Sequence, residues 1–192
     1  MTHTIVYLNG EFLPSEQANI SVFDRGFLFG DGVYEVIPVY ASEPFHLKEH
    51  LLRLKSSLKI SRFTATIDLG QLEKNLLELL KRNQNTCGDC LIYVQITRGT
   101  DTSRKFYFAP DLKPTILATL QAIKLPTYKE LCLGKTAITL PDIRWQHNHI
   151  KTISLLPSVL LYEQVRDAGC DEGVLIRNGS VVEGISSNIF IV

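Results

Sequence analysis

Two Asn-Gly dipeptides constrain the fold of this chain more than any other local feature. Asn9-Gly10 separates the short apolar runs 5–8 and 11–13, and Asn178-Gly179 separates two similar runs within 173–182. Both residues of such a dipeptide accept the positive φ angles of a tight hairpin turn. We therefore predict an antiparallel hairpin close to each end of the sequence.

Leucines that recur every three or four residues predict two amphipathic helices, over 47–60 and 69–83. A third helix is expected over 154–168. Further strands are expected over 33–40, 90–98, 114–123 and 135–140. Because the strands come as hairpins and the helices are grouped, an α+β fold is favoured over a doubly wound parallel sheet.

Prolines and a glycine refine these boundaries. Pro38 indicates a sheet edge or a bulge, since proline has no N–H to donate. Pro157 fits a helix only in its first turn, and Gly169 suits the position just after the helix end. The segment 125–128 contains Pro126 and follows a strand, so we interpret it as a linker between two halves.

The charge balance excludes some classes of partner. Lys and Arg number 20, as do Asp and Glu, so the formal net charge is zero. Without a basic excess, neither a nucleic acid nor an anionic membrane surface is an expected partner. No apolar run approaches the roughly 20 residues of a membrane span, and no secretory signal is visible.

The cysteines suggest reduced thiols rather than a metal site. Cys87 and Cys90 form a Cys-x-x-Cys, but no second pair follows at zinc-binding spacing. We expect no metal and a cytoplasmic protein.

Three acidic or basic residues stand where chemistry is conceivable. Lys151 follows the aromatic- and His-rich run 145–150 and could act as a nucleophilic amine; alternatively it is the polar first residue of a helix. Glu183 precedes the Gly-, Ser- and Asn-containing run 184–188 and could bind a ligand nitrogen, or could be a solvated turn residue. Asp31, between two glycines, indicates a tight turn and little more.

Five motifs in a fixed order resemble a known family. They are FDRGFLFGDGVYEV at 23–36, HLLRLKSS at 50–57, QITRGTDTSR at 95–104, DIRWQHNHIKT at 142–152 and VVEGISSNIF at 181–190. The chain is similar over essentially its whole length to the class IV, or fold-type IV, pyridoxal-phosphate (PLP) enzymes, above all to the D-amino-acid aminotransferases. The resemblance implies transfer of the amino group of a D-amino acid, D-alanine or similar, to a 2-oxo acid such as 2-oxoglutarate.

The resemblance also implies a domain organisation. Residues 1–124 would form a small N-terminal α/β domain, and 125–192 would begin a larger C-terminal, pseudo-barrel domain that binds the cofactor. The sequence stops within SSNIFIV, an apolar strand-like run. We therefore expect the remainder of that domain to belong to a longer protein.

Cofactor-binding roles follow residue by residue from the resemblance. Lys151 matches the lysine that holds PLP covalently and later moves the proton at the substrate Cα. Glu183 matches the acid that pairs with the pyridine nitrogen. Arg53 matches the arginine that binds the cofactor phosphate, although a solvated helix face would also explain an arginine there. A loop lining the cofactor is matched by Ser186, Ser187 and Asn188.

Substrate recognition is implied for Tyr34 and Arg104. Tyr34 matches a tyrosine that helps to hold the substrate carboxylate, and Arg104 matches an arginine that reaches into the partner subunit's site, which implies a homodimer. The D-amino-acid enzymes have a histidine two residues after that arginine, where this chain has Phe106. This departure replaces a polar group by an apolar one and leaves strict D-alanine recognition open.

Other interpretations remain open. A branched-chain L-amino-acid aminotransferase has the same chemistry, and Phe106 favours it slightly, whereas Arg104 and Tyr34 favour the D-specific enzyme. Aminodeoxychorismate lyase belongs to the same family but eliminates pyruvate. The non-enzymatic alternatives are a catalytically inactive fragment and a general α+β binding domain. The aromatic run 106–108 could lie at a subunit interface or fold back onto its own core.

Overall fold

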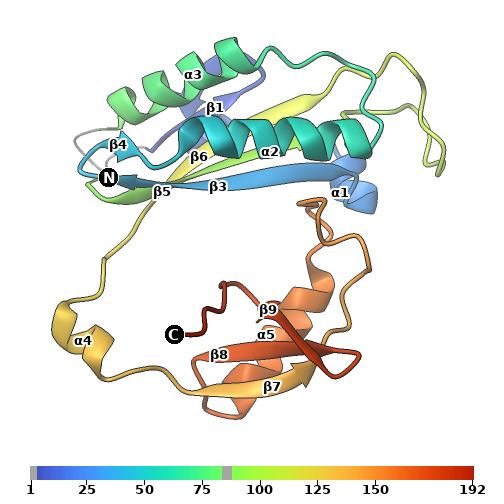
Figure 1. Cartoon of the computed structure of the whole chain (residues 1–192). Coiled ribbons are helices and arrows are strands. Elements are labelled where there is room, and N and C mark those ends of the chain that lie inside the picture. The colour runs from blue at the N-terminus through green and yellow to red at the C-terminus, as the bar shows by residue number, and fades with distance from the viewer. Residues whose placement is uncertain (1–3, 84–87) are drawn as a thin grey trace. The chain divides into compact units, whose positions relative to one another are not determined.

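A computed structural model describes residues 4–83 and 88–192 (Figure 1). They form two compact units. The first extends to Leu125 and also includes His149–Ile153, whereas the second comprises Pro126–Asn148 and Ser154–Val192. The chain thus leaves the first unit after Leu125 and returns to it for the short segment His149–Ile153. The predicted division into 1–124 and 125–192 would assign this segment to the second domain.

The first unit contains an antiparallel six-stranded sheet in the order β2-β1-β6-β5-β3-β4. Its strands are β1 (Ile5–Leu8), β2 (Glu11–Pro14), β3 (Gly32–Tyr40), β4 (Glu43–Pro44), β5 (Cys90–Thr97) and β6 (Thr115–Ala122). The β1–β2 turn has φ angles of 52° at Asn9 and 104° at Gly10. These positive angles confirm the predicted hairpin.

Pro38 occupies a place in β3 where no N–H is needed. Its carbonyl accepts a 2.8 Å hydrogen bond from the amide of Phe45, on the side of β3 away from β5. The N and C=O of one strand residue point to the same side, so the missing donor also faces away from β5. There β4 contributes only two residues, which agrees with the sheet-edge position predicted for Pro38.

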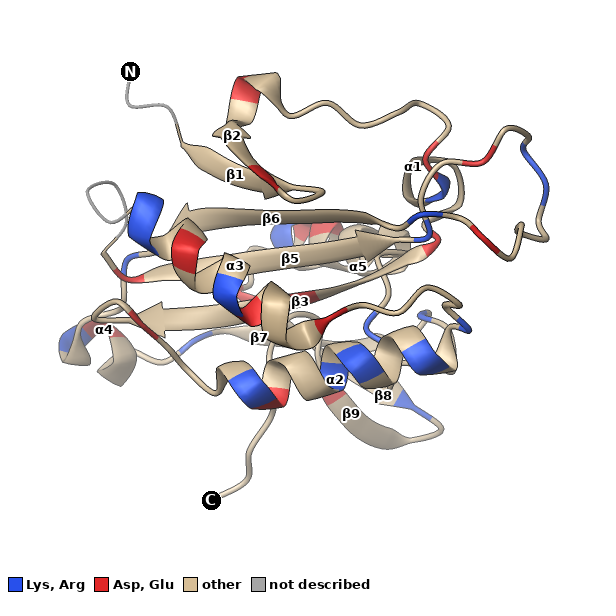
Figure 2. Cartoon of the chain, turned by 90° about the horizontal axis from the view of Figure 1, so that it is seen from above, with Lys and Arg blue, Asp and Glu red and all other residues tan. Residues whose placement is uncertain are grey.

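One face of this sheet is covered by α2 (Leu47–Ile60) and α3 (Leu69–Arg82) (Figure 1). Asp68 begins α3 by accepting a hydrogen bond from the amide of Gln71. The outer surface of α3 carries both signs of charge along its length (Figure 2). The leucines of α2 and α3 pack against β3 and β5 in one hydrophobic core. The buried residues of this core include Val33, Ile37, Leu51, Leu54, Leu58, Leu72, Leu76, Leu79, Ile92, Val94 and Ile96. Because burial of each such side chain stabilises the folded state by roughly 1.5–3 kcal/mol, this packing holds the two helices on the sheet.

A short helix, α1 (Arg25–Phe29), precedes β3 and is absent from the sequence-based prediction. Asp24 accepts a hydrogen bond from the amide of Gly26 at its start, and Gly30 ends it in the left-handed conformation, with φ 67°. These are ordinary helix-capping residues. A helix of five residues is too short to show a hydrophobic period, so only the caps could have indicated it.

The second unit contains a three-stranded sheet and α5 (Leu156–Asp167). Its strands are β7 (Ala137–Pro141), β8 (Glu172–Arg177) and β9 (Ser180–Gly184). The pair β8–β9 is the predicted hairpin, whereas β7 and β8 run parallel. A parallel pair needs a long connection rather than a tight turn, and no local turn motif indicates it. Against this sheet α5 buries Leu161 and Val165.

The ends of the helices in the second unit follow local rules. Pro157 lies in the first turn of α5, and Gly169, with φ 66°, follows its C-cap. A short helix, α4 (Tyr128–Cys132), begins at the last residue of the segment 125–128 that was interpreted as a linker. Thr127 and Glu130 form a reciprocal capping box at its start. This Thr-x-x-Glu pattern is visible in the sequence but was missed.

The cysteines of the described residues are not in disulfides: Cys90 is buried, Cys132 exposed and Cys170 intermediate. Cys87 lies outside the described residues. Within 4–83 and 88–192 no three His, Cys, Asp or Glu side chains are grouped as a metal site would require. No helix of the described part is both long and apolar enough to cross a membrane.

Candidate active site

Lys151 lies in a short irregular segment that is hydrogen-bonded to both α2 and β3. Its amide donates to Oγ of Ser57 in α2 at 3.3 Å, and its carbonyl accepts from the amide of Tyr34 in β3 at 2.9 Å. Ser57 is 1% exposed, so this contact is shielded from water. The alternative that Lys151 only begins a helix is wrong, because α5 starts at Leu156.

Gly32 allows the segment to approach β3 closely. Its carbonyl accepts hydrogen bonds from Oγ1 of Thr152 and the amide of Ile153, both at 3.1 Å. A Cβ on Gly32 would lie 2.8 Å from Cδ1 of Ile153 and 2.9 Å from the carbonyl oxygen of Ile96. Only glycine fits between β5 and the Lys151 segment without displacing one of them.

The amine of Lys151 lies over an aromatic ring. Its Nζ is 4.5 Å from the centroid of Tyr34, a cation–π distance. On the neighbouring strand the ring of Tyr93 is 5.6 Å from that of Tyr34, and its hydroxyl donates to Oε1 of Gln95 at 2.6 Å. Burial, with a smaller contribution from Tyr34, raises the pKa of Tyr93 to about 12. The Tyr93 phenol therefore keeps its proton at neutral pH.

Arg53 is oriented by a buried carboxylate that sequence analysis missed. Its Nε and Nη2 each donate to Glu35 at 2.6 Å, and Nδ1 of His50 lies 2.9 Å from the same carboxylate. Glu35 has no exposed side-chain surface, whereas Arg53 is 52% exposed. The hydrogen bond with Glu35 raises the pKa of Arg53. Nη1 of Arg53 has no partner among the described residues and can donate to a ligand.

Arg53 and Ser57 share one side of α2. They are four residues apart, which places them on successive turns of the same face. The helix that anchors the backbone of Lys151 therefore also presents the exposed guanidinium. The first unit thus carries an amine, an aromatic hydroxyl and a guanidinium on segments that are hydrogen-bonded to one another: Lys151, Tyr34 and Arg53.

In the second unit, Glu183 lies within β9 and is not a solvated turn residue. Its Oε1 is 2.8 Å from Nη1 of Arg144, whose other nitrogens hold the buried carboxylate of Asp142 at 2.9 and 3.1 Å. Burial opposes ionisation of Asp142, but hydrogen bonds from Arg144 and the charge of Arg177 lower its pKa overall. Oε2 of Glu183 has no hydrogen-bond partner among the described residues, so an N–H of a ligand could bind there.

The loop after β9 is attached to Glu172. The hydroxyls of Ser186 and Ser187 donate to Oε2 of Glu172 at 3.1 and 2.8 Å, while Asn188 is exposed. Burial opposes ionisation of Glu172, but the amide of Gly173 and the two hydroxyls lower its pKa overall. An ionised Glu172 thus orients two of the three loop residues predicted to line the cofactor.

Arg104 and Phe106 lie on the loop between β5 and β6, beside α1. The guanidinium carbon of Arg104 is 5.0 Å from the ring centroid of Phe29, and the Phe106 ring is 5.7 Å from the same ring. Phe106 is nevertheless 86% exposed. The aromatic residues therefore fold partly onto α1 and still leave apolar surface open.

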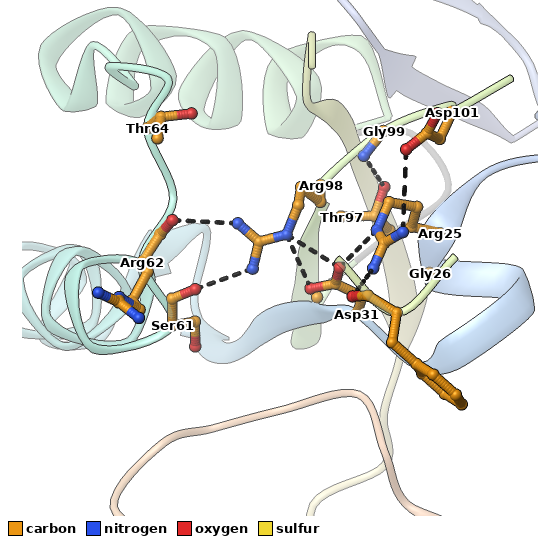
Figure 3. A network of polar contacts seen from close by, with 12 residues as sticks. Arg25, Gly26, Asp31, Ser61, Arg62, Thr64, Thr97, Arg98, Gly99 and Asp101 are labelled. Atoms are coloured by element: carbon orange, nitrogen blue, oxygen red, sulfur yellow. Dashed lines mark hydrogen bonds and ion pairs between the residues drawn. The ribbon is translucent and has the colours of Figure 1, made fainter. Parts of the chain in front are cut away.

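A buried ion-pair network, which the sequence did not indicate, supports this loop (Figure 3). Asp31, in the predicted Gly-Asp-Gly turn, accepts hydrogen bonds from Nε of Arg25 at 2.8 Å and from Nε of Arg98 at 2.9 Å. Both arginines are almost fully buried. Arg98 also donates to the carbonyls of Ser61 and Arg62 at the end of α2. Both arginines lie in the recognised motifs, but isolated motifs do not reveal that they share one carboxylate.

The model of the family described as amino-transferase class IV matches residues 32–192 of this chain. D-alanine aminotransferase of Staphylococcus epidermidis is 38% identical over 190 residues, which cover 97% of this chain and 65% of the relative. D-alanine aminotransferase of Bacillus licheniformis is 37% identical over 186 residues, covering 97% and 64%. The chain thus spans slightly less than two thirds of the length of these relatives.

Solved structures with the same architecture include the T.th. branched-chain amino acid aminotransferase complexed with N-(5'-phosphopyridoxyl)-L-glutamate. It matches with a TM-score of 0.83 and 25% identity, over 96% of this chain and 62% of that one. The branched-chain amino acid aminotransferase of Escherichia coli matches with a TM-score of 0.81 and 23% identity, over 96% and 62%. The second likeness concerns the fold alone.

Proposed function

Because the chain belongs to the class IV aminotransferase family, we propose that its protein is a PLP-dependent transaminase that moves the amino group of D-alanine, or of a similar D-amino acid, to a 2-oxo acid such as 2-oxoglutarate. The relatives named D-alanine aminotransferase support this substrate class. The observation that carries the proposal is the amine of Lys151, which lies over Tyr34 with its backbone held by both α2 and β3.

PLP fits the donor types of the chain. The cofactor needs an amine for attachment, a cation for its phosphate and an acid for its pyridine nitrogen. Lys151 has the amine. Within residues 4–83 and 88–192, Nη1 of Arg53 and Oε2 of Glu183 have no hydrogen-bond partner and can bind a ligand. When bound, PLP supplies an electron sink for the electron pair left on the substrate Cα.

The residues of the chain orient the reaction. Nζ of Lys151 would take the proton from Cα of the amino donor and, in the second half of the reaction, deliver one to Cα of the amino acid formed from the 2-oxo acid. Its fixed backbone limits the direction of approach. Nη1 of Arg53 donates to the cofactor phosphate, with the guanidinium plane set by Glu35. Arg144 holds the carboxylate of Glu183 so that its second oxygen can accept from the pyridine N–H.

Substrate recognition in this proposal uses Tyr34 and Arg104. A guanidinium and a phenol are both suitable donors for a carboxylate. Arg104 would act across a homodimer. Large apolar side chains exposed around its loop support such an interface: Phe23, Phe27, Phe106 and Tyr107 are between 56% and 86% exposed. Light scattering of the full-length protein tests the dimer, and cell fractionation tests the proposed cytoplasmic location.

The decisive experiment compares two amino donors. Full-length protein purified with PLP is assayed for transfer from D-alanine and, in parallel, from L-leucine to 2-oxoglutarate. We expect transfer from D-alanine only. Lys151→Ala should abolish both turnover and the yellow absorbance of the attached cofactor. Full turnover by this variant would contradict the assignment of Lys151.

A branched-chain enzyme is the second candidate, and the apolar Phe106 is the observation that favours it. Transfer from L-leucine alone would establish that alternative. If both donors fail although the cofactor is attached, release of pyruvate from aminodeoxychorismate tests for the lyase.

A further inference from the structure

Arg25 is a buried cation whose contacts converge on one loop. It is 3% exposed and lies at the start of α1. Its Nη1 donates to the carbonyl of Lys105 at 2.8 Å, and its Nη2 donates to the carbonyl of Phe106 at 3.1 Å. The third nitrogen, Nε, donates to Asp31. All three guanidinium nitrogens are therefore used, two of them on consecutive peptide groups.

These two carbonyls belong to the two residues that follow Arg104. Arg25 and Phe29 are four residues apart in α1, so their side chains lie on one face. The guanidinium of Arg25 is 4.7 Å from the Phe29 ring and that of Arg104 is 5.0 Å from it. The backbone after Arg104 and the side chain of Arg104 are therefore both held by the same short helix.

The support is anchored beyond the loop. Asp31 binds Arg25 and Arg98 together, and Arg98 reaches the carbonyls at the end of α2 (Figure 3). Since α2 also carries Arg53, the loop is connected through buried hydrogen bonds to the helix of the proposed phosphate ligand. A buried network in which each guanidinium nitrogen has a hydrogen-bond partner tolerates little displacement.

We propose that Arg25 is a positioning residue for substrate recognition, which holds the 104–106 backbone so that the Arg104 guanidinium can receive the substrate carboxylate. This inference rests on the function proposed above, in which Arg104 binds that carboxylate. A lysine could keep the charge beside Asp31 but could not reach two carbonyls with a planar fork. Arg25→Lys is therefore the informative substitution.

The first measurement is kinetic and uses the full-length holoenzyme. With D-alanine, Arg25→Lys should raise KM about tenfold and change kcat less than about twofold. A displaced Arg104 guanidinium weakens substrate binding more than it slows proton transfer. In an Arg104→Ala background the same substitution should change KM less than about twofold, because the group it positions is gone. An equal rise of KM in both backgrounds would overturn the proposal.

The second measurement needs no activity. The bond that trypsin cleaves after Lys105 contains the carbonyl that Arg25 holds, so cleavage there should require release of this backbone, and mass spectrometry of the fragments reports loop detachment. Arg25→Lys should accelerate this cleavage at least about fivefold over the wild type. An unchanged cleavage rate would overturn the proposal for Arg25, whether or not D-alanine is the substrate. Failure of this proposal can therefore be distinguished from failure of the proposed function.

Two variants complete the design. Arg82→Lys is the matched control, because Arg82 forms an exposed pair with Glu78 and should alter neither KM nor loop cleavage. If Arg25→Lys does not fold, Phe29→Leu removes the ring between the two guanidinium groups and keeps an apolar side chain. It should also raise KM for D-alanine, and an unchanged KM with unchanged cleavage would overturn the proposal.

Discussion

The amide of Tyr34 donates a 2.9 Å hydrogen bond to the carbonyl oxygen of Lys151, and the amine of Lys151 lies 4.5 Å from the Tyr34 ring. A single strand residue thus fixes the backbone of the proposed proton-transfer residue and contacts its side chain. Successive strand residues face opposite sides of a sheet, so Glu35 turns towards α2 and Arg53. A shift of the pairing register of β3 by one residue would turn Glu35 away from Arg53 and Tyr34 towards it.

Removing the hydroxyl of Ser57 should loosen Lys151. Ser57→Ala deletes the buried acceptor of the Lys151 amide and should lower the free energy of unfolding by about 1 kcal/mol. It should also lower kcat more than cofactor affinity, because the amine loses its fixed approach. Ser56→Ala is the matched control, since Ser56 is exposed on the same helix. Equal kcat values for the two variants would contradict the anchoring role.

A methyl group at Gly32 should separate the Lys151 segment from the sheet. Its Cβ would lie 2.8 Å from Ile153 and 2.9 Å from a backbone oxygen of β5, so Gly32→Ala should destabilise the protein by about 1–3 kcal/mol. Gly70→Ala is the control, because a Cβ there would meet only Oδ1 of Asp68 at 3.4 Å, an ordinary van der Waals distance, and alanine should stabilise α3 by up to about 0.5–1 kcal/mol. Urea unfolding measures both changes, and shifts of the same sign would contradict the packing argument.

The elements best predicted from the sequence are those specified by local rules. The leucine period gives α2 with its observed bounds, Leu47–Ile60, and the Asn-Gly turns give both hairpins. The parallel pairing of β7 with β8 was missed because its partners are distant in the chain. The return of Lys151 to β3 was missed for the same reason: no spacing in the sequence links it to Tyr34.

The family resemblance identifies candidate site residues, but it does not identify the residues that hold them in place. Arg53 was assigned to a phosphate, but its orientation depends on Glu35, which reads in the sequence as an ordinary strand residue. Glu183 similarly depends on Arg144. A buried charge is identified by its three-dimensional neighbours, so the supporting residues became visible only in the structure. The assigned roles of Lys151, Glu183, Arg53 and the other site residues remain predictions.

Tyr93 should produce a stability change at high pH. The folded protein holds its proton more tightly than the unfolded chain, because burial raises the pKa from 10.0 to about 12. The resulting stabilisation is complete below pH 10 and is lost as the pH rises through about 12. Tyr93→Phe should therefore show a smaller loss of unfolding free energy across this interval than the wild type. Tyr128→Phe, at an 83% exposed tyrosine, is the control, and parallel curves for Tyr93→Phe and the wild type would contradict the prediction.

Arg53 should contribute separately to folding and to cofactor binding. Arg53→Ala leaves the buried carboxylate of Glu35 with His50 alone, which should cost about 1–3 kcal/mol of unfolding free energy in the apo-protein. Adding Glu35→Gln should recover most of that loss, because the neutral amide needs no cation. It should not recover PLP affinity, expected to fall at least about tenfold when the phosphate ligand is removed. Lys55→Ala on exposed α2 surface is the control; recovery of PLP affinity by the double variant would refute phosphate binding by Arg53.

Phe106→His should strengthen D-alanine recognition without affecting folding. The side chain is 86% exposed, so the unfolding free energy should change by less than about 0.5 kcal/mol. An imidazole beside Arg104 can donate a hydrogen bond to a carboxylate, which the phenyl ring cannot. We expect KM for D-alanine to fall several-fold with kcat nearly unchanged. Phe27→His, on a 78% exposed phenylalanine of α1, controls for the loss of an exposed aromatic ring. An unchanged KM would place position 106 outside the carboxylate site, and the apolar residue there would then no longer argue for a branched-chain substrate.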